Sequence, residues 1–271
     1  MPELPEVETV KNSLYPIIGK KILSINTSGK KFRITPPANF CNLLLNKRIT
    51  DLTRRSKYIL IHLEDENILV IHLGMSGKIL LNTETHNNKH NHLEIDLTGD
   101  NRLIFNDARR FGLYTVIPGS EINTHNLFKN LGVEPLTPAL NPGYLHKIFK
   151  NRAAPIKPLL MDASLIVGVG NIYAAESLFR AKISPLRAAK SLNEGEIATL
   201  CEMIKIILFE AIESGGSTLR DYVRSSGDIG YFQHKFKVYG RVGQECYICE
   251  EVILNNKMAG RSTFYCPKCQ S

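Results

Sequence analysis

Two CxxC pairs near the end of the chain constrain its fold more than any other feature. The pairs read CYIC and CPKC, and sixteen residues separate them. Two such pairs at this distance are typical of a tetrahedral Cys₄ zinc site that holds a β-hairpin. Two disulfides are the alternative, which a reducing cytoplasm disfavours. We therefore expect one structural zinc ion, bound by Cys246, Cys249, Cys266 and Cys269, with the hairpin tip near 255–260.

The start of the chain and its charge indicate the compartment and the kind of partner. The opening MPELPEVETV lacks the basic residues and apolar run of a secretory signal. The apolar runs elsewhere are too short and interrupted to span a membrane. We therefore expect a cytoplasmic protein that does not bind membranes. The formal net charge of +8 favours anionic partners, nucleic acid first, although charge alone does not exclude an ordinary basic enzyme.

The order of hydrophobic patterns predicts an α+β multidomain fold. Val7, Val10, Leu14 and Ile17 have helical spacing, and strand patterns follow from residue 20 to about 118. Within these, ILIHL and LVIHL flank the polar EDEN and predict an antiparallel hairpin. We expect an N-terminal β-sandwich with an N-terminal helix over 1–120, a linker over 121–140, a helical domain over 141–234 and the zinc hairpin over 235–271.

A glycine-containing turn in the helical region is a candidate phosphate site. In GVGNIYAAESLF, Gly168 and Gly170 precede Asn171, which we expect to cap the following helix. An exposed helix N-terminus binds phosphate through its N–H groups, and Lys157 would supply a cation nearby. The alternative is an ordinary packing turn between two helices.

Three further segments are candidates for contact with nucleic acid. GMSG and NDARRFG place Met75, Arg109 and Phe111 beside glycines, as expected of loop tips that wedge into a base stack. Buried core positions are the alternative for Met75 and Phe111. RRSKYIL, with Arg54, Arg55 and Lys57, is either a solvated strand start or part of a phosphate channel.

Six segments, in order from end to end, closely resemble the bacterial formamidopyrimidine-DNA glycosylases: PELPEVET, HLGMSG, DARRFG, VGVGNIYAAESLF, GGSTLRDY and STFYCPKCQ. The resemblance implies a β-sandwich, a helix–two-turn–helix domain and a zinc hairpin, with damaged double-stranded DNA as partner. It implies a base-excision-repair enzyme that removes oxidised purines such as 8-oxoguanine and formamidopyrimidines, and then cleaves the strand by β,δ-elimination. We expect this enzyme to act as a monomer.

The resemblance gives the opening segment a chemical role. An amine nucleophile that forms an imine with the sugar must be unprotonated, and an α-amine has a pKa of roughly 8 against about 10.4 for lysine. Pro2 offers such an amine only after Met1 is removed, because its nitrogen is otherwise a tertiary amide. Glu3 is suited to donate or relay a proton, and Glu6 to orient it. A plain helix start explains Pro5 and Glu6 equally well, but it explains Pro2 and Glu3 less well.

The resemblance also implies roles for residues further along the chain. Lys57 would contact phosphate and assist proton transfer, and Arg261 would grip phosphates and assist the final elimination. The segment 217–232 would close over the everted base. Met75, Arg109 and Phe111 would fill the gap that this base leaves. The DNA-backbone contacts would be His90, Arg152 and Asn171.

Two alternatives stay open on the sequence. An endonuclease VIII-type enzyme would share the architecture but prefer oxidised pyrimidines. A non-catalytic zinc-ribbon protein that binds nucleic acid would explain the charge and the cysteines, but not Pro2 and Glu3.

Overall fold

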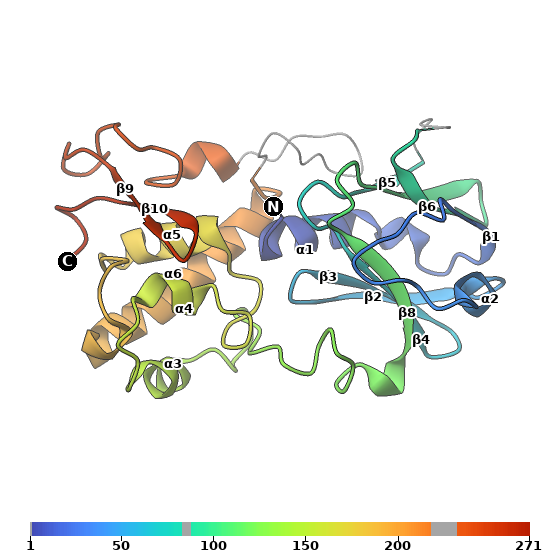
Figure 1. The fold of residues 1–271 in the computed structure, drawn as a ribbon, viewed down its shortest axis with the longest axis horizontal. Coiled ribbons are helices and arrows are strands. Elements are labelled where there is room, and N and C mark those ends of the chain that lie inside the picture. The colour runs from blue at the N-terminus through green and yellow to red at the C-terminus, as the bar shows by residue number, and fades with distance from the viewer. Residues whose placement is uncertain (1, 83–87, 218–231) are drawn as a thin grey trace. The chain divides into compact units, whose positions relative to one another are not determined.

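The computed structural model describes residues 2–82, 88–217 and 232–271 (Figure 1). Contacts divide the chain into two compact units. The first holds the chain up to Lys129 and resumes at Gly215, and the second holds Asn130–Ser214 and Phe232–Ser271. The chain therefore leaves the first unit and returns to it between two segments of the second.

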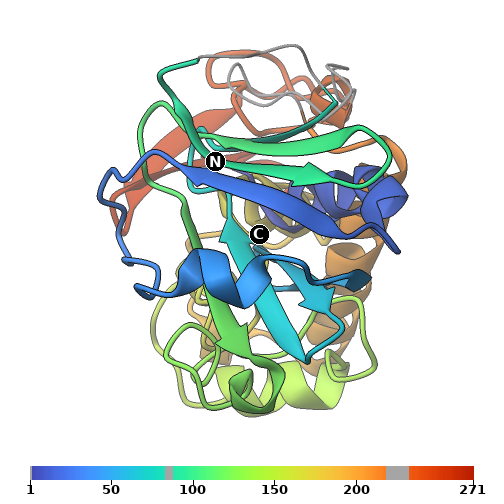
Figure 2. The same cartoon turned by 90° about the vertical axis from the view of Figure 1, so that its right-hand side faces the viewer.

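The first unit is a β-sandwich, which confirms the predicted fold class. Its two antiparallel sheets have four strands each, in the orders β1-β6-β7-β5 and β2-β3-β4-β8, and Figure 2 shows them stacked face to face. The strands of the first sheet are β1 (Ile22–Thr27), β5 (Lys78–Leu81), β6 (Asn91–Leu97) and β7 (Asn101–Asn106). Those of the second are β2 (Ile49–Arg55), β3 (Tyr58–Leu63), β4 (Asn67–His72) and β8 (Leu113–Pro118).

The β3–β4 hairpin forms where the repeated ILIHL and LVIHL pattern predicts it. Leu60 pairs with Val70 and Ile61 with Leu69. Alternate residues of the two strands point to opposite faces, so Ile59, Ile61, Leu69 and Ile71 enter the core between the sheets. The hairpin thus contributes one wall of the sandwich core.

The predicted N-terminal helix is present as α1 (Leu4–Ser13). Its apolar face places Val7, Val10 and Leu14 in the sandwich core, and the helix contacts β2 and β3. The described part of the unit also holds three short helical elements: η1 (Tyr15–Ile17), α2 (Phe40–Leu44) and η2 (Gly119–Glu121). This packing fixes the start of α1 against the second sheet.

The second unit is largely helical, in agreement with the predicted C-terminal helical region. Its helices are α3 (Pro142–Phe149), α4 (Ile156–Leu160), α5 (Asn171–Arg180), η3 (Ala189–Ser191), α6 (Glu194–Glu213) and η4 (Phe232–Lys235). Asn193 and Glu196 form a capping box at the start of α6, the longest helix, because each side chain accepts the other's backbone N–H. No helix within the described ranges combines the length and apolar content needed to cross a membrane.

The C-terminal hairpin belongs to this second unit. Strands β9 (Leu254–Met258) and β10 (Arg261–Tyr265) pair in antiparallel register and turn at Ala259 and Gly260, within the predicted tip. Figure 1 shows the hairpin beside α5. Val238 and Ile253 pack there on Ala175 and Phe179 of α5, so a small apolar cluster anchors the hairpin.

Candidate active site and metal site

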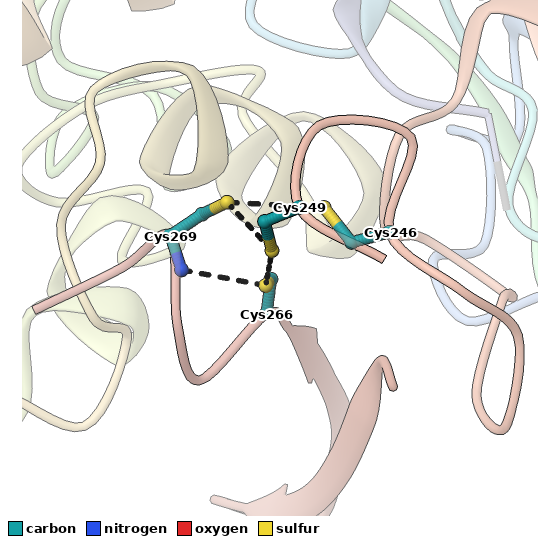
Figure 3. A group of neighbouring side chains, drawn as sticks. All are labelled: Cys246, Cys249, Cys266 and Cys269. Atoms are coloured by element: carbon teal, nitrogen blue, oxygen red, sulfur yellow. Dashed lines mark hydrogen bonds between the residues drawn. The ribbon is translucent and has the colours of Figure 1, made fainter. Parts of the chain in front are cut away.

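The four paired cysteines converge at the base of the C-terminal hairpin (Figure 3). Their sulfur atoms all lie within 4.8 Å of one another. The Sγ–Sγ distances are 3.8 Å between Cys246 and Cys269, 3.5 Å between Cys249 and Cys266, and 3.3 Å between Cys249 and Cys269. Zn–S bonds of about 2.3 Å place the sulfurs of a tetrahedral site roughly 3.8 Å apart, so the four thiols fit a zinc ion.

Backbone N–H groups donate to sulfur atoms of the cluster and favour a thiolate at Cys246, whereas burial and the neighbouring thiols raise the pKa of Cys266 and Cys269. Ile248 N donates to Cys246 Sγ at 3.5 Å, and Cys269 N donates to Cys266 Sγ at 3.4 Å. Burial opposes ionisation of Cys246, but the N–H groups of Ile248 and Cys249 lower the pKa of this thiol to about 7. A metal bound here would have four thiolate ligands and no open position, as in structural zinc sites.

The N-terminal residues with the predicted chemistry are buried. Pro2 and Glu3 are both buried, and only 3% of Glu3 is exposed. Glu3 is the N-cap of α1, and its backbone N–H donates to Glu6 Oε2 at 2.8 Å. Glu6 thus holds the backbone next to Pro2, as a residue in the first turn of the helix can.

The second carboxylate oxygen of Glu6 binds a distant part of the chain. Ser217 donates to Glu6 Oε1 from its backbone N at 2.8 Å and from its hydroxyl at 2.9 Å. Gly216 precedes Ser217 with φ +80°, and a Cβ there would lie 3.2 Å from Glu6. Both the conformation and the close approach therefore favour glycine. Ser217 begins the segment 217–232 that we expect to cover the base, and residues 218–231 of that segment lie outside the described residues.

Lys57 lies in the tight turn between β2 and β3. Ser56 is buried in the left-handed conformation at φ 56°, and Lys57 is half-buried. The Tyr58 ring lies 4.8 Å from the ring of His72, at the end of β4. Burial, together with the charges of Arg33 and Lys57, lowers the pKa of His72 to about 4. His72 is therefore neutral at pH 7, and its Nδ1 accepts the Gly74 N–H at 3.0 Å.

The predicted wedge residues line one pocket of 640 Å³ in the first unit. Met75 is 39% exposed and Phe111 48%, so neither is a core residue. The Arg109 guanidinium lies 4.7 Å above the centre of the Phe111 ring. Lys31, Arg33 and Arg110 also line the pocket, which makes it strongly cationic. A cationic pocket with exposed apolar tips suits a nucleic-acid backbone and its bases.

Asp107 organises the two loops of this pocket and was not predicted from the sequence. Its carboxylate is fully buried and accepts from Ser76 Oγ at 2.7 Å and Gly112 N at 2.8 Å. Residue 74 must be glycine, because a Cβ there would lie 2.3 Å from Gly112 N of the other loop. An acidic residue directly before ARRFG is the signal that could have indicated this role. The loop tips are thus held from below by one carboxylate.

A buried lysine joins the glycine turn to the hairpin in the second unit. Lys157 is 1% exposed, and its ammonium donates to Asn171 Oδ1 at 2.6 Å, Thr263 Oγ1 at 2.9 Å and the Ser262 carbonyl at 3.0 Å. The prediction that Asn171 is the N-cap of its helix is wrong. Gly170 is the N-cap of α5 and Asn171 is its first residue, because the Asn171 side chain accepts from Lys157.

Glu176 secures the segment that enters the hairpin, and it too was missed. Its buried carboxylate accepts backbone N–H groups of Lys237, Val238 and Tyr239 at 2.8–3.0 Å. Tyr239 packs edge-on against Phe264 of β10, with 5.2 Å between ring centres. Helix α5 therefore holds the hairpin by a polar clamp as well as by apolar contacts.

The remaining predicted residues lie at turns. Arg261 is exposed at the first position of β10, and it lines a pocket of 170 Å³ together with Lys157 and Met258. Arg152 is exposed after α3, with its Nε bound to the Ile148 carbonyl at 3.1 Å. His90 precedes β6, and its carbonyl accepts the Asp107 N–H at 3.0 Å. The first unit thus groups Met75, Arg109 and Phe111, and the second groups Lys157, Asn171 and Arg261.

Comparison with known proteins covers the whole chain. The family descriptions of the formamidopyrimidine-DNA glycosylase N-terminal domain and H2TH domain match residues 1–114 and 131–223. Formamidopyrimidine-DNA glycosylases of Wolbachia pipientis subsp. Culex pipiens and Dinoroseobacter shibae are 47% and 45% identical, with 100% of each chain covered.

Solved structures agree with this assignment. The wild-type Lactococcus lactis Fpg in complex with N7-benzyl-Fapy-dG containing DNA has a TM-score of 0.92 and 36% identity, with both chains fully covered. MutM (Fpg) from Thermus thermophilus has a TM-score of 0.88 and 38% identity, over 99% of this chain and 98% of that chain. A MutM in complex with carbocyclic 8-oxo-G containing DNA has a TM-score of 0.91 at 36% identity, again with full coverage of both chains. From its buried Pro2–Glu3 start to its Cys₄ hairpin, this chain belongs to the formamidopyrimidine-DNA glycosylase family.

Proposed function

We propose that this protein excises oxidised purines, such as 8-oxoguanine and formamidopyrimidines, from double-stranded DNA and then cleaves the strand at the resulting abasic site. The observation that carries the proposal is the buried Pro2–Glu3 segment, held by Glu6, in a chain that belongs to this family throughout. Relatives solved with Fapy-dG and 8-oxo-G containing DNA support the purine substrate.

The proposed nucleophile is the Pro2 amine after removal of Met1. Its lone pair attacks C1′ of the damaged nucleotide while the bond between C1′ and the base breaks, and the base leaves with the bonding electrons. Loss of the amine proton and opening of the sugar give an iminium ion, which activates C2′ for proton loss and elimination. Glu3 donates or relays protons at the sugar, and Lys57 and Arg261 assist the transfers and the elimination at the phosphates.

The proposed DNA contacts come from both units. Met75, Arg109 and Phe111 take the place of the everted base, which is consistent with their exposure around the cationic pocket. Lys157 contributes its charge from beneath Asn171, at the start of α5. The full set of proposed direct DNA contacts is His90, Arg109, Arg152, Asn171, Met75 and Phe111, and the buried Lys157 supports them through its charge.

We propose that the metal is zinc and that its role is structural. Zinc would bind the four cysteine sulfurs and hold the two CxxC turns together, so that β9 and β10 leave the cluster in a fixed direction. The four sulfur ligands and the small Sγ separations support this assignment. The metal would thereby fix the position of Arg261 at the start of β10.

We further propose that the protein acts as a monomer, in the cytosol and on nucleoid DNA. The net charge of +8 and the membership of a DNA-repair family support this location. Light scattering during size-exclusion chromatography should give one species near 30.4 kDa, and a mass twice that value would contradict a monomer.

The central experiment measures incision and covalent trapping on the same duplexes. Duplexes that carry 8-oxoguanine, a formamidopyrimidine or an oxidised pyrimidine are incubated with the protein, with and without borohydride. We expect purine-selective incision and a reduced covalent adduct. A form that retains an N-terminal extension before Pro2 is the matched control and should trap no adduct. Preference for pyrimidines would indicate endonuclease VIII-type activity, and binding without incision or adduct would indicate a non-catalytic protein.

A further inference from the structure

We propose that Arg54 is a positioning residue that locks helix α1 to the turn carrying Lys57. The inference rests on the proposed roles of Pro2 and Lys57. Arg54 is neither a solvated strand-start cation nor a phosphate contact in this interpretation. Its guanidinium instead fixes the relative placement of the two segments that deliver the nucleophile and the proton-transferring lysine.

The geometry of Arg54 links two elements of the first unit. Arg54 Nε donates to Glu8 Oε2 on α1 at 2.6 Å. Its Nη1 donates to the Ser56 carbonyl at 2.8 Å, and this carbonyl belongs to the peptide that leads into Lys57. One planar guanidinium therefore binds the helix with one edge and the turn with another.

The surroundings make this link stiffer than a surface ion pair. The side chains of Arg54 and Glu8 are only 10% and 19% exposed. Glu8 also binds Lys11 Nζ at 2.7 Å, so its carboxylate is held from two sides. Burial opposes the charge of Glu8, but hydrogen bonds from Lys11 and Arg54 outweigh it and keep the pKa of Glu8 below its ordinary value. The pair is thus charged at neutral pH and weakly screened by solvent.

The turn needs such a link because its conformation is unfavourable. Ser56 has φ +56°, which is uncommon for a residue with a Cβ, and it is 4% exposed. The hydrogen bond from Arg54 to its carbonyl sets the orientation of the Ser56–Lys57 peptide. Lysine would offer one ammonium in place of this two-edged contact, so even the conservative replacement should loosen the turn.

Arg54 should therefore matter for the precise placement of the amine and Lys57, and not for the binding of DNA. Helix α1 begins at Leu4, directly after Pro2 and Glu3, so a shift of α1 relative to the turn changes the distance between the amine and Lys57. A misplacement of about 1 Å can lower a catalytic rate by roughly a hundredfold. Loss of Arg54 should therefore slow the chemical steps more than it weakens DNA binding.

The test compares Arg54→Met, Arg54→Lys, Glu8→Gln and the double variant Glu8→Gln/Arg54→Met with the parent. Arg102→Met is the matched control, because Arg102 makes the same Nε-to-carboxylate contact, at 2.5 Å to Asp96, in the other sheet. Single-turnover rates of borohydride trapping and strand cleavage are measured on a duplex with a preformed abasic site. Affinity for an uncleavable abasic analogue and the far-ultraviolet spectrum are measured in parallel.

We expect Arg54→Met to lower both single-turnover rates about tenfold or more, with affinity changed less than about threefold. Arg54→Lys should recover part of the rate, and Arg102→Met should match the parent. Because Glu8 and Arg54 act through one contact, the double variant should be no slower than Arg54→Met.

The inference would be overturned if Arg54→Met kept rates within about twofold of the parent. It would also be overturned if the rate losses of Glu8→Gln and Arg54→Met multiplied in the double variant. If Arg54→Met fails to fold, Arg54→Lys and Glu8→Gln decide the question by the same criteria. Failure of the proposed function is distinguishable, because the parent protein would then trap no adduct at all.

Discussion

Glu6 and Ser217 lie 211 positions apart in the chain, and both the backbone N–H and the hydroxyl of Ser217 donate to the same carboxylate oxygen of Glu6. The other oxygen of Glu6 accepts the Glu3 N–H. A single carboxylate therefore connects the residue next to Pro2 with the start of the segment that we expect to cover the damaged base. We infer that the positions of Ser217 and Glu3 are coupled through Glu6.

Replacing Gly216 with alanine tests this connection. The backbone at φ +80° disfavours any Cβ, and the new methyl group would press on Glu6 at 3.2 Å. We expect a loss of about 1–2 kcal/mol in the free energy of unfolding and a clear loss of base excision.

Gly240→Ala is the matched control for this variant. Gly240 has φ +75°, and a Cβ there meets nothing within 4 Å. We expect Gly240→Ala to lose a similar amount of unfolding free energy and to excise bases as fast as the parent. Equal excision rates for Gly216→Ala and Gly240→Ala would show that pressure on Glu6 from residue 216 does not affect the residues next to Pro2.

Replacing Pro2 with glycine tests the nucleophile. Glycine keeps an α-amine after Met1 is removed, but it lacks the ring that restricts its orientation. We expect damaged-DNA binding close to that of the parent and excision at least about tenfold slower, measured as single-turnover rates. A Pro2→Gly protein as fast as the parent would contradict the positioned-amine mechanism.

Replacing Phe111 with alanine tests the wedge. The exposed ring below Arg109 should hold the stack open after the base leaves, so the variant should slow excision from intact duplex. Cleavage at a preformed abasic site should change much less, because less unstacking is needed there. Phe209→Ala is the control, because Phe209 is also an exposed aromatic residue but lies on α6. It should change neither rate. An equal loss on both substrates would indicate that Phe111 supports the fold.

Replacing Cys249 with serine and Arg261 with alanine separates the metal from the arginine. Both variants should weaken binding to an abasic analogue, but only Cys249→Ser should lower the zinc content. Arg261→Ala should also reduce the slope of log affinity against log salt by about 1, as expected for one lost phosphate contact. Lys257→Ala, on the same hairpin, is the control. An unchanged slope for Arg261→Ala would mean that Arg261 does not contact phosphate.

The pKa of His72 predicts a pH dependence of stability. This pKa is lowered from 6.5 to about 4, chiefly by burial. The unfolded chain therefore binds a proton that the folded chain does not, and the stabilisation is complete above about pH 6.5 and is lost as the pH falls toward 4. His72→Gln should remove roughly 3 kcal/mol of this dependence, measured as the difference in unfolding free energy between pH 7 and pH 4. Parallel pH curves for parent and variant would contradict it.

Local patterns in the sequence were sufficient to predict the first helix, the β3–β4 hairpin and the cysteine cluster. The helical spacing of Val7, Val10 and Leu14 predicts α1, and the repeated ILIHL and LVIHL predict the β3–β4 hairpin. The CxxC spacing predicts the cysteine cluster because each pair sits in one turn. These features depend on residues close together in the chain, where sequence periodicity reports directly on geometry.

The residues that support the site could not be predicted in this way. Asp107 reaches back to Ser76, Lys157 reaches Thr263, and Glu176 holds three N–H groups near Lys237. The Asn171 cap was predicted wrongly for the same reason, since a lysine fourteen positions earlier occupies its side chain.

The sequence by itself thus determined the first helix, the β3–β4 hairpin and the cysteine turns, and it indicated which side chains are candidates for the chemistry. Only the tertiary structure decided which polar groups those side chains satisfy. A buried charge or carboxylate must find hydrogen-bond partners wherever the fold places them, and a partner such as Ser217 for Glu6 leaves no periodic trace in the chain.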